Sequence, residues 1–316
     1  MAGFMSTNTD NLTRANIWTQ ELKDVFYADL MAQKYVRMLD FPDGDTLNIP
    51  SIGTFQVADY AEGQPVHYTA MDTGNFTFTI NKYKQTGTYI TRKAKQDLFY
   101  ASQLVSSFVP KQMRAISEQM ETDVLALAPD GQTASNLNAI NGANHRFIGS
   151  GTNETIDVKD FALAANALDM ANVPNTNRVA IVHPSVEFKL NTLTNLVNAS
   201  FNPSFEGIVN TGFRTGMRFI RNIYGFDVYV SKFLKSGVAE TINGLTTTVG
   251  VANLFFSAGS GDECAFVGAV RQAPQVDTEF NKDYQRDEYV VTCRYGYKLF
   301  RPEGVVVVLT DTDQVA

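Results

Sequence analysis

The chain has 316 residues, and its 26 lysines and arginines against 33 aspartates and glutamates give a formal net charge of −7. Proteins that bind nucleic acid without sequence preference neutralise phosphates with an excess of Lys and Arg, so this acidic composition argues against that class. With 2 Cys and 3 His in the whole sequence, a disulfide scaffold is excluded and a zinc site with several ligands nearly so. The length fits one large domain or two to three smaller ones.

No targeting or membrane-spanning segment is evident. The N-terminus has neither the basic start nor the apolar core of a signal peptide. The longest aliphatic run, residues 305–309, is far shorter than the ~20 residues that cross a bilayer. We therefore expect a protein that stays in a reducing cytosol without membrane contact, with Cys264 and Cys293 as small buried hydrophobic side chains.

The first 45 residues are expected to form an N-terminal arm. Residues 1–13 are polar and offer little to bury. From residue 17 to residue 39, apolar side chains that begin with Trp18 recur mostly at spacings of three and four, which predicts an amphipathic helix. A Pro-Asp-Gly-Asp turn at 42–45 ends this helix.

Residues 46–90 are expected to form an extended loop. The segment 46–49 alternates polar and apolar residues, and Phe76, Phe78 and Ile80 alternate with polar residues further on. Glycines and a proline punctuate the stretch between them. We interpret residues 47–90 as one long, protruding two-stranded loop.

A long helix is predicted for residues 92–127 within a segment 91–131. Its apolar residues form one stripe, Pro110 should kink or break it, and the Pro-Asp-Gly sequence at 129–131 should end it. Glu118, Glu121 and Asp123 lie within this helix, and we expect them on a solvated face.

The remaining chain mixes helices and short strands. Residues 132–155 should be loop; Asp157 should cap a helix over 158–172, with Asp160 as the reciprocal capping acid. A helix that opens at Pro184 should follow a strand at 178–182, and 198–216 should be irregular. Further strands are expected at 226–230, 246–256, 264–270, 289–299 and 304–310, with an acidic connection at 277–287. Without strict alternation of strand and helix, the fold class is α+β.

Catalytic and cofactor motifs are absent from the sequence. It contains neither of the glycine-rich nucleotide-binding motifs, no nucleophile elbow, no H-E-x-x-H and no C-x-x-C. His67, His145 and His183 are isolated, and His183 is best read as the junction between a strand and the helix that Pro184 opens. We therefore expect no enzyme, no cofactor and no metal, and a function that acts through surfaces.

Three local patterns, in order along the chain, resemble the major capsid proteins of tailed double-stranded DNA phages, which have the Hong Kong 97-type fold. They are ALDMANVP at 167–174 followed by RVAIVHP at 178–184, YGFDVYVS at 224–231, and YGYKLFRPEGV at 295–305. The order of arm, extended loop, long helix and mixed α+β region fits the same family.

The resemblance implies a domain organisation. Residues 1–45 would be the N-terminal arm, 46–90 the extended loop, and 91–131 a spine helix in the peripheral domain. Residues 132–262 would be the axial domain, 263–303 the return strands of the peripheral domain, and 304–316 the last strand of the axial domain with a tail.

The resemblance also implies a structural function. The chain would assemble with itself, as hexamers and pentamers, into an icosahedral head shell around DNA that it contacts without sequence specificity. The segment before the Trp18 helix is short, which resembles members with a separate scaffolding protein, and a portal would be a further partner. Assembly would take place in the host cytoplasm, and the assembled protein would be part of the virion. No Lys–Asn cross-link can be matched to this sequence.

Contacts between subunits would involve Tyr60, Glu62, Gln64 and Val66 at the loop tip and Trp18 in the arm. Two alternatives remain at this point: another structural protein of a phage head or tail, and an enzyme whose site is built from scattered residues.

Overall fold

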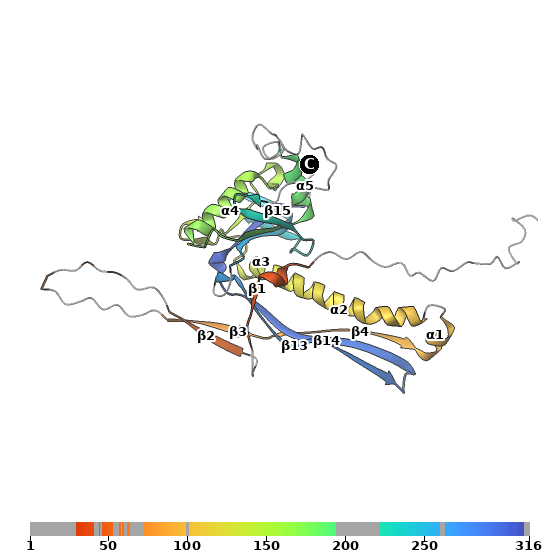
Figure 1. The fold of residues 1–316 in the computed structure, drawn as a ribbon. Helices are drawn as coiled ribbons and strands as arrows, with labels where there is room; N and C mark the ends of the chain where they lie inside the picture. The colour runs from red at the N-terminus through yellow and green to blue at the C-terminus, as the bar shows by residue number, and fades with distance from the viewer. Residues whose placement is uncertain are drawn as a thin grey trace, which may run out of the picture.

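The computed structural model describes residues 30–40, 44, 46–52, 57, 59, 62–63, 73–98, 101–193, 222–259 and 263–312. Expectations for residues 1–29, for the irregular segment 198–216 and for the side chain of Val105 on the predicted stripe lie outside this description. Within it, the chain forms two main β-sheets, a long helix between them and a two-stranded ribbon (Figure 1).

A seven-stranded sheet forms one half of the molecule. Its strand order is β7 (Arg146–Ile148), β15 (Val305–Asp311), β12 (Leu245–Ser257), β8 (Arg178–Val182), β10 (Phe226–Val230) and β9 (Asn222–Ile223), and β11 (Val238–Ile242) pairs with β12. Strand β15 runs parallel to β7 and antiparallel to β12. The last described strand therefore lies inside the sheet and not at its edge.

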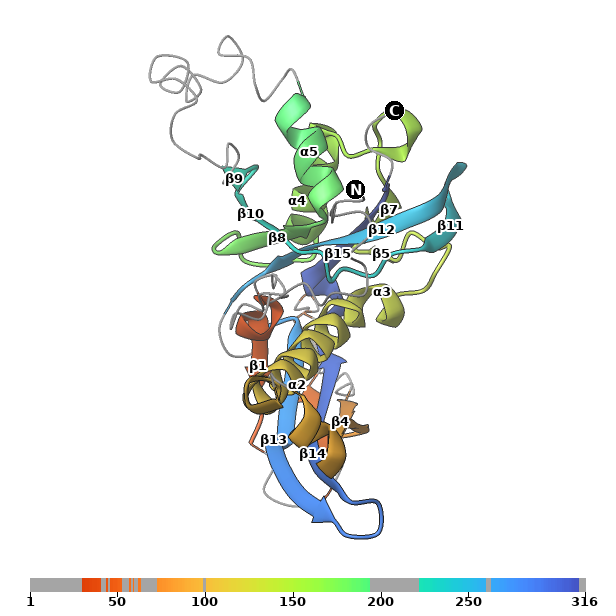
Figure 2. The ribbon, with the colours of Figure 1, turned by 90° about the vertical axis from the view of Figure 1, so that its right-hand side faces the viewer.

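Both faces of this sheet are covered. Helices α4 (Val158–Met170) and α5 (Pro184–Thr192) lie on one face (Figure 2), where Phe161 and Val186 pack with Val306 and Val308 of β15. The intervening residues of β15, such as Val307, belong to a second core on the opposite face. A strand that is buried on both faces needs an unbroken apolar sequence, which explains the aliphatic run in the sequence.

A four-stranded sheet forms the other half, in the order β1 (Val36–Met38), β13 (Phe266–Asn281), β14 (Arg286–Leu299) and β4 (Lys82–Thr91). Helix α2 (Ala101–Leu125) lies along it between α1 (Arg92–Asp97) and α3 (Leu127–Gly131) (Figure 1). Ile116 and Met120 of α2 share one core with Val291 and Cys293 of β14. For the described side chains, the apolar stripe of the helix therefore packs on these strands.

The prediction for the end of the N-terminal arm is wrong where the structure describes it. Instead of continuing a helix to residue 39, the chain forms a 3₁₀ turn, η1 (Ala32–Tyr35), and then strand β1. Val36 of β1 pairs in parallel with Phe266 of β13. Pairing with a distant strand overrides the local periodicity here.

The predicted loop is too long at its C-terminal end. Residues 46–79 contain the ribbon strands β2 (Thr46–Ile52) and β3 (Thr73–Thr79), which pair with each other. Strand β4 instead pairs along its whole length with β14 and belongs to the four-stranded sheet. The acidic segment 277–287 is likewise not a connection, because most of it lies in the long β13–β14 hairpin.

Three smaller expectations also need correction. Pro110 does not break the helix, since it lies inside α2. The break comes earlier, where α1 ends at its C-cap residue Leu98. The predicted loop 132–155 contains β7 and three short elements, β5 (Ala139–Ile140), β6 (Ala143–Asn144) and η2 (Thr152–Glu154). Cys293 is buried as expected, but Cys264 is only half-buried.

The local signals around α4 and β8 are confirmed. Asp157 caps α4, and the Asp160 carboxylate accepts a hydrogen bond from the Asp157 amide at 2.9 Å, which completes the capping box. His183 is the N-cap of α5, and its Nδ1 accepts a hydrogen bond from the Ser185 amide at 3.3 Å. A short turn, η5 (Pro302–Gly304), then leads from β14 into β15.

Candidate functional site

The β2–β3 ribbon projects from the body (Figure 1), and among its described side chains those at the base are packed. Phe78 and Ile80 are buried, as expected for the apolar end of the ribbon, in a small cluster with Val267 and Ala269 of β13. Phe76 is half-buried beside this cluster, while its neighbours Asn75 and Thr77 are exposed. The described part of the ribbon has no core of its own.

Two contacts fix the base of the ribbon to the β14 end. The rings of Phe76 and Phe300 meet edge-on with centroids 4.9 Å apart. The Lys298 ammonium lies 4.8 Å from the centre of the Phe76 ring and donates a hydrogen bond to the Thr77 carbonyl at 2.6 Å. The direction in which the ribbon leaves the body is therefore set by side chains of the four-stranded sheet.

Of the five predicted contact residues, the structure describes one. Glu62 is exposed in a turn with Gly63, whose φ of +80° is readily adopted by glycine. Tyr60, Gln64, Val66 and Trp18 lie outside the described residues. The structure therefore brings none of these residues together, and their role stays a prediction.

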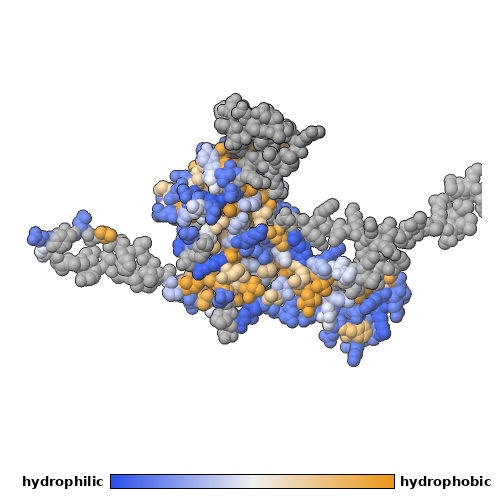
Figure 3. All heavy atoms as spheres, in the orientation of Figure 1, coloured by the Kyte–Doolittle hydropathy of each residue, from blue (hydrophilic) through white to orange (hydrophobic). Residues whose placement is uncertain are grey.

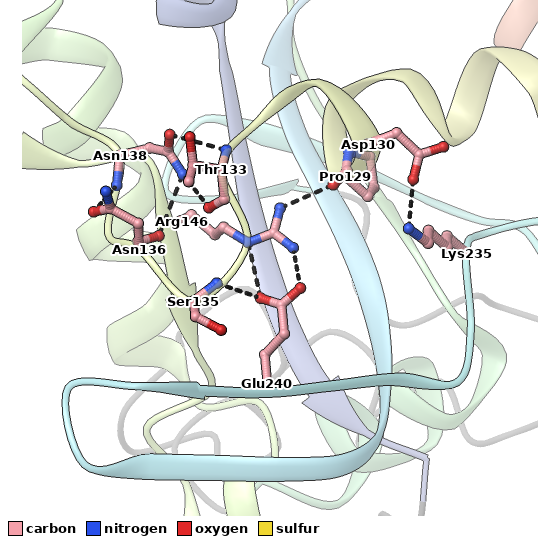
Figure 4. A network of polar contacts seen from close by, with 9 residues as sticks. All are labelled: Pro129, Asp130, Thr133, Ser135, Asn136, Asn138, Arg146, Lys235 and Glu240. Carbon is pink, nitrogen blue, oxygen red and sulfur yellow. Dashed lines mark hydrogen bonds and ion pairs between the residues drawn. The ribbon is translucent and has the colours of Figure 1, made fainter.

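A buried ion pair links two strands of the seven-stranded sheet beside α3 (Figure 4). The Arg146 guanidinium of β7 donates to both carboxylate oxygens of Glu240 in β11, at 2.6 and 3.1 Å. It also donates to the Pro129 carbonyl of α3 at 3.2 Å, and Lys235 forms an ion pair with Asp130 nearby. Only 1% of the Arg146 side chain and 8% of the Glu240 side chain are exposed.

Because this pair is removed from water, each charge depends on its partner. Glu240 also accepts a hydrogen bond from the Ser135 amide at 3.3 Å, which ties in the chain that follows α3 (Figure 4). Sequence reasoning missed this pair, since Arg146 and Glu240 are far apart in the chain and belong to no motif. Through Arg146 and Lys235, these contacts connect α3 to the sheet.

The sequence analysis expected the acidic residues of α2 to lie on a solvated face, but they do not form one. Glu121 is fully buried. Asp123 accepts a hydrogen bond from the Tyr295 hydroxyl at 2.6 Å and forms an ion pair with Lys82 at 2.9 Å. Glu118, which pairs with Arg114 one turn earlier, is partly exposed.

Perturbed titratable groups are scattered through the described residues. Burial raises the pKa of Asp160 and lowers the pKa of His183. Burial, followed by the hydrogen bond to Asp123, raises the pKa of Tyr295. Each of these groups has a local structural role, and they do not face one another in a common site.

The described surface contains hollows beside the long helix and beside α4. One of about 460 Å³ lies between α2, α3 and β14 and contains Lys82, Asp123 and Lys298 among its lining residues. Another of about 310 Å³ lies beside α4 and includes Lys159 and Leu163. Across the part of the chain that the structure describes, no group of three His, Cys, Asp or Glu side chains could hold a metal ion. No helix in those residues is long and apolar enough to cross a membrane.

Comparison with known proteins identifies the family. A family model described as phage capsid protein matches residues 74–308, most of the chain. No curated protein matches the chain.

Solved structures share the fold at low sequence identity. A chain of Mycobacterium phage Che8 is 20% identical, with 94% of this chain and 97% of that chain covered and a TM-score of 0.70. The capsid structure of the cyanophage P-SCSP1u is 15% identical, with coverage of 95% and 93% and a TM-score of 0.71. The acid-stable capsid of Helicobacter pylori bacteriophage KHP30 is 10% identical, with coverage of 98% and 99% and a TM-score of 0.68. The chain therefore belongs to the phage capsid protein family: it is a structural major capsid protein of the phage head shell, with the Hong Kong 97-type fold.

Proposed function

We propose that this protein assembles with itself, as hexamers and pentamers, into a closed icosahedral shell around double-stranded DNA, and that the β2–β3 ribbon is the arm that joins subunits. The observation that carries the proposal is the ribbon itself. It projects from the body, and among its described side chains those at its base, Phe76, Phe78 and Ile80, are packed. A two-stranded ribbon alone in water is marginally stable, so a neighbouring subunit would supply the surface that it lacks.

The contact residues follow from this arrangement. Tyr60, Glu62, Gln64 and Val66 lie in the middle of the sequence that connects the two ribbon strands. Trp18 belongs to the N-terminal arm, residues 1–45. We assign these five residues to contacts made between subunits.

The domain organisation that we propose follows the two sheets. Residues 132–262 with 304–316 would form the axial domain around the seven-stranded sheet, whereas 91–131 and 263–303 would form the peripheral domain. Residues 82–90 join the peripheral domain, because β4 pairs with β14, so the extended loop shortens to 46–81.

The partners of the shell are part of the same proposal. A separate scaffolding protein would direct assembly in the host cytoplasm, and a portal would occupy one vertex. The net charge of −7 suits a wall that contacts packaged DNA without specificity, since tight phosphate binding needs excess positive charge. The protein would act through these surfaces and catalyse no reaction.

The test is to replace residues 58–72 with a short Gly-Ser link. The variant should stay folded and soluble, as measured by thermal melting, but should fail to form closed shells in electron microscopy and sedimentation with the co-expressed phage partners. A second variant, in which a Gly-Ser segment of the original length replaces 58–72, separates the loss of tip side chains from the loss of chain length. It too should fail to close.

Three outcomes would contradict the proposal. Normal capsids from the shortened protein would show that the loop is not the arm between subunits. Precipitation of an unfolded protein would place the loop in the core. Tubes, rings or small oligomers from the unmodified protein and its partners would favour another structural role in the phage particle.

A further inference from the structure

The segment of residues 30–39 contacts all three layers that surround the central core. It lies against α2 and forms strand β1 at the edge of the four-stranded sheet (Figures 1 and 2). Its Tyr35 side chain contacts the seven-stranded sheet. Such a short piece of chain would not be expected to matter for shape unless these contacts are strong.

The contact with α2 is a buried carboxylate. Glu121 is fully buried, and its oxygens accept hydrogen bonds from the amides of Met31 and Ala32, each at 2.9 Å. Among the described residues, Glu121 forms no ion pair with a basic side chain. A buried charge is costly unless hydrogen bonds compensate it, so the position of Glu121 and the position of residues 31–32 depend on each other.

The contact with the four-stranded sheet depends on a glycine, Gly268. Val36 pairs with Phe266, and the Leu39 amide donates a hydrogen bond to the Gly268 carbonyl at 2.8 Å. A Cβ atom at Gly268 would lie 2.9 Å from Val36 and 2.5 Å from Tyr297. The absence of a side chain at residue 268 therefore allows the segment to lie this close to the sheet.

The contact with the seven-stranded sheet is aromatic. The Tyr35 ring meets Phe256 of β12 edge-on with centroids 5.3 Å apart, and it lies 6.4 Å from the ring of Tyr229 in β10. Tyr35 stands between the Glu121 contact and the β1 strand in sequence. One segment thus holds α2, the four-stranded sheet and the seven-stranded sheet at the same time.

We propose that residues 30–39 form a latch that fixes the angle between the two sheets, with Glu121 as the positioning residue that keeps the latch closed. Release of the latch removes the bridge between Tyr35 and the seven-stranded sheet and leaves the sheets free to move about the shared core. The latch is a property of the single subunit. Its consequence for the directions in which a subunit faces its neighbours rests on the proposed function.

The experiment uses the unassembled full-length subunit and Glu121→Ala. Hydrogen exchange of the amides in residues 31–39 should become at least tenfold faster than in the unmodified protein, while exchange in β8 stays unchanged. Glu118→Ala is the matched control, since it lies one turn away on α2 and is partly exposed, and it should leave residues 31–39 protected. Unchanged protection of 31–39 in Glu121→Ala would overturn the role of Glu121.

The angle itself is measured by spin labels, one on each half of the molecule, in a background with Cys264→Ser. Tyr83→Cys in β4 and Leu163→Cys in α4 use exposed positions. The distance distribution should be narrow in the parent and in Glu118→Ala, and at least twice as broad in Glu121→Ala. An equally narrow distribution in Glu121→Ala would show that the latch does not set the angle.

A second variant guards against simple misfolding. Tyr35→Ala removes the aromatic contact but keeps the carboxylate and its two amides, so it should broaden the distance distribution while residues 31–32 stay protected. A narrow distribution in this variant, or a loss of protection throughout the molecule in both variants, would overturn the proposal.

Discussion

The seven-stranded sheet and the far half of the β13–β14 hairpin, residues 277–290, contain the same kinds of interaction. These interactions are buried in the sheet and exposed or half-buried in the hairpin. In the sheet, β15 and residues 250–257 of β12 are buried on both faces. In the hairpin, residues 277–281 and 286–290 are exposed or half-buried, and the surface at that end is mostly hydrophilic in the view of Figure 3. The core of the sheet is buried within one subunit, whereas the side chains of the hairpin remain accessible.

The difference shows that similar contacts contribute differently to stability and to assembly. Arg146–Glu240 and Arg286–Glu288 are both Arg–Glu pairs with a shortest distance of 2.6 Å. The first pair is almost fully buried, but about 30% of each side chain in the second pair is exposed. The two pairs should contribute differently to the free energy of unfolding because their burial differs, and not because of the distance between their atoms.

The largest effect is expected from truncation of an aromatic side chain. Phe255 is fully buried, and its ring meets Phe161 and Phe226 edge-on at 5.0 and 5.3 Å. Phe255→Ala should lower the free energy of unfolding by about 3–5 kcal/mol, because it leaves a cavity in a packed core. Phe280→Ala, at a hairpin position that is 39% exposed, should cost less than about 1 kcal/mol. Denaturant unfolding of the isolated subunit compares the two, and equal losses would refute the contrast.

The ion pairs give the next largest difference. Arg146→Met should lower the free energy of unfolding by about 3 kcal/mol, because it leaves the Glu240 carboxylate buried without its partner. Arg286→Met should change it by only about 0–1 kcal/mol, as is usual for an exposed pair. Addition of Glu240→Met to Arg146→Met should recover part of the loss. If the double variant is less stable than the single one, the unpaired charge is not the cause.

The smallest effect is a pH dependence at Tyr35, whose ring contacts the seven-stranded sheet. Burial raises the pKa of Tyr35 from 10.0 to about 12. The folded state therefore holds this proton more tightly than the unfolded state, so stability is unaffected below about pH 10 and falls as the pH rises toward 12. Tyr35→Phe should lose less stability between pH 10 and 12 than the unmodified protein does. Denaturant unfolding across this range measures the difference, and parallel curves would exclude Tyr35 as a source of the loss.

The sequence predicted the elements that local chemistry controls. Asp157 and Asp160 specify the start of α4 through a capping box that needs only residues within four positions. The aliphatic run of β15 and the alternation around Phe78 likewise carry their own signals. The sequence analysis predicts these features correctly because they do not depend on contacts with residues far away in the chain.

The errors arise where a distant partner decides the structure. The periodicity through residue 39 favoured a helix, but β1 forms because β13 offers a parallel edge. Glu121 has the sequence surroundings of a solvated helix residue, and only the amides of Met31 and Ala32, ninety residues away, explain its burial. The contact residues that we propose between β2 and β3 would depend on a second subunit, so a single chain carries even less information about them.

The place of β15 in the sheet has a consequence for folding kinetics. Val307 pairs in parallel with Arg146 and in antiparallel with Leu254, so the sheet closes only when a late segment inserts between two strands made much earlier. Contacts this far apart in sequence raise the contact order, and folds that depend on them form slowly. Until residues 305–311 arrive, the apolar β12 is an open edge on which chains can aggregate. Newly made subunits should therefore spend their most vulnerable period just before this strand docks, when a chaperone would have the greatest effect on their yield.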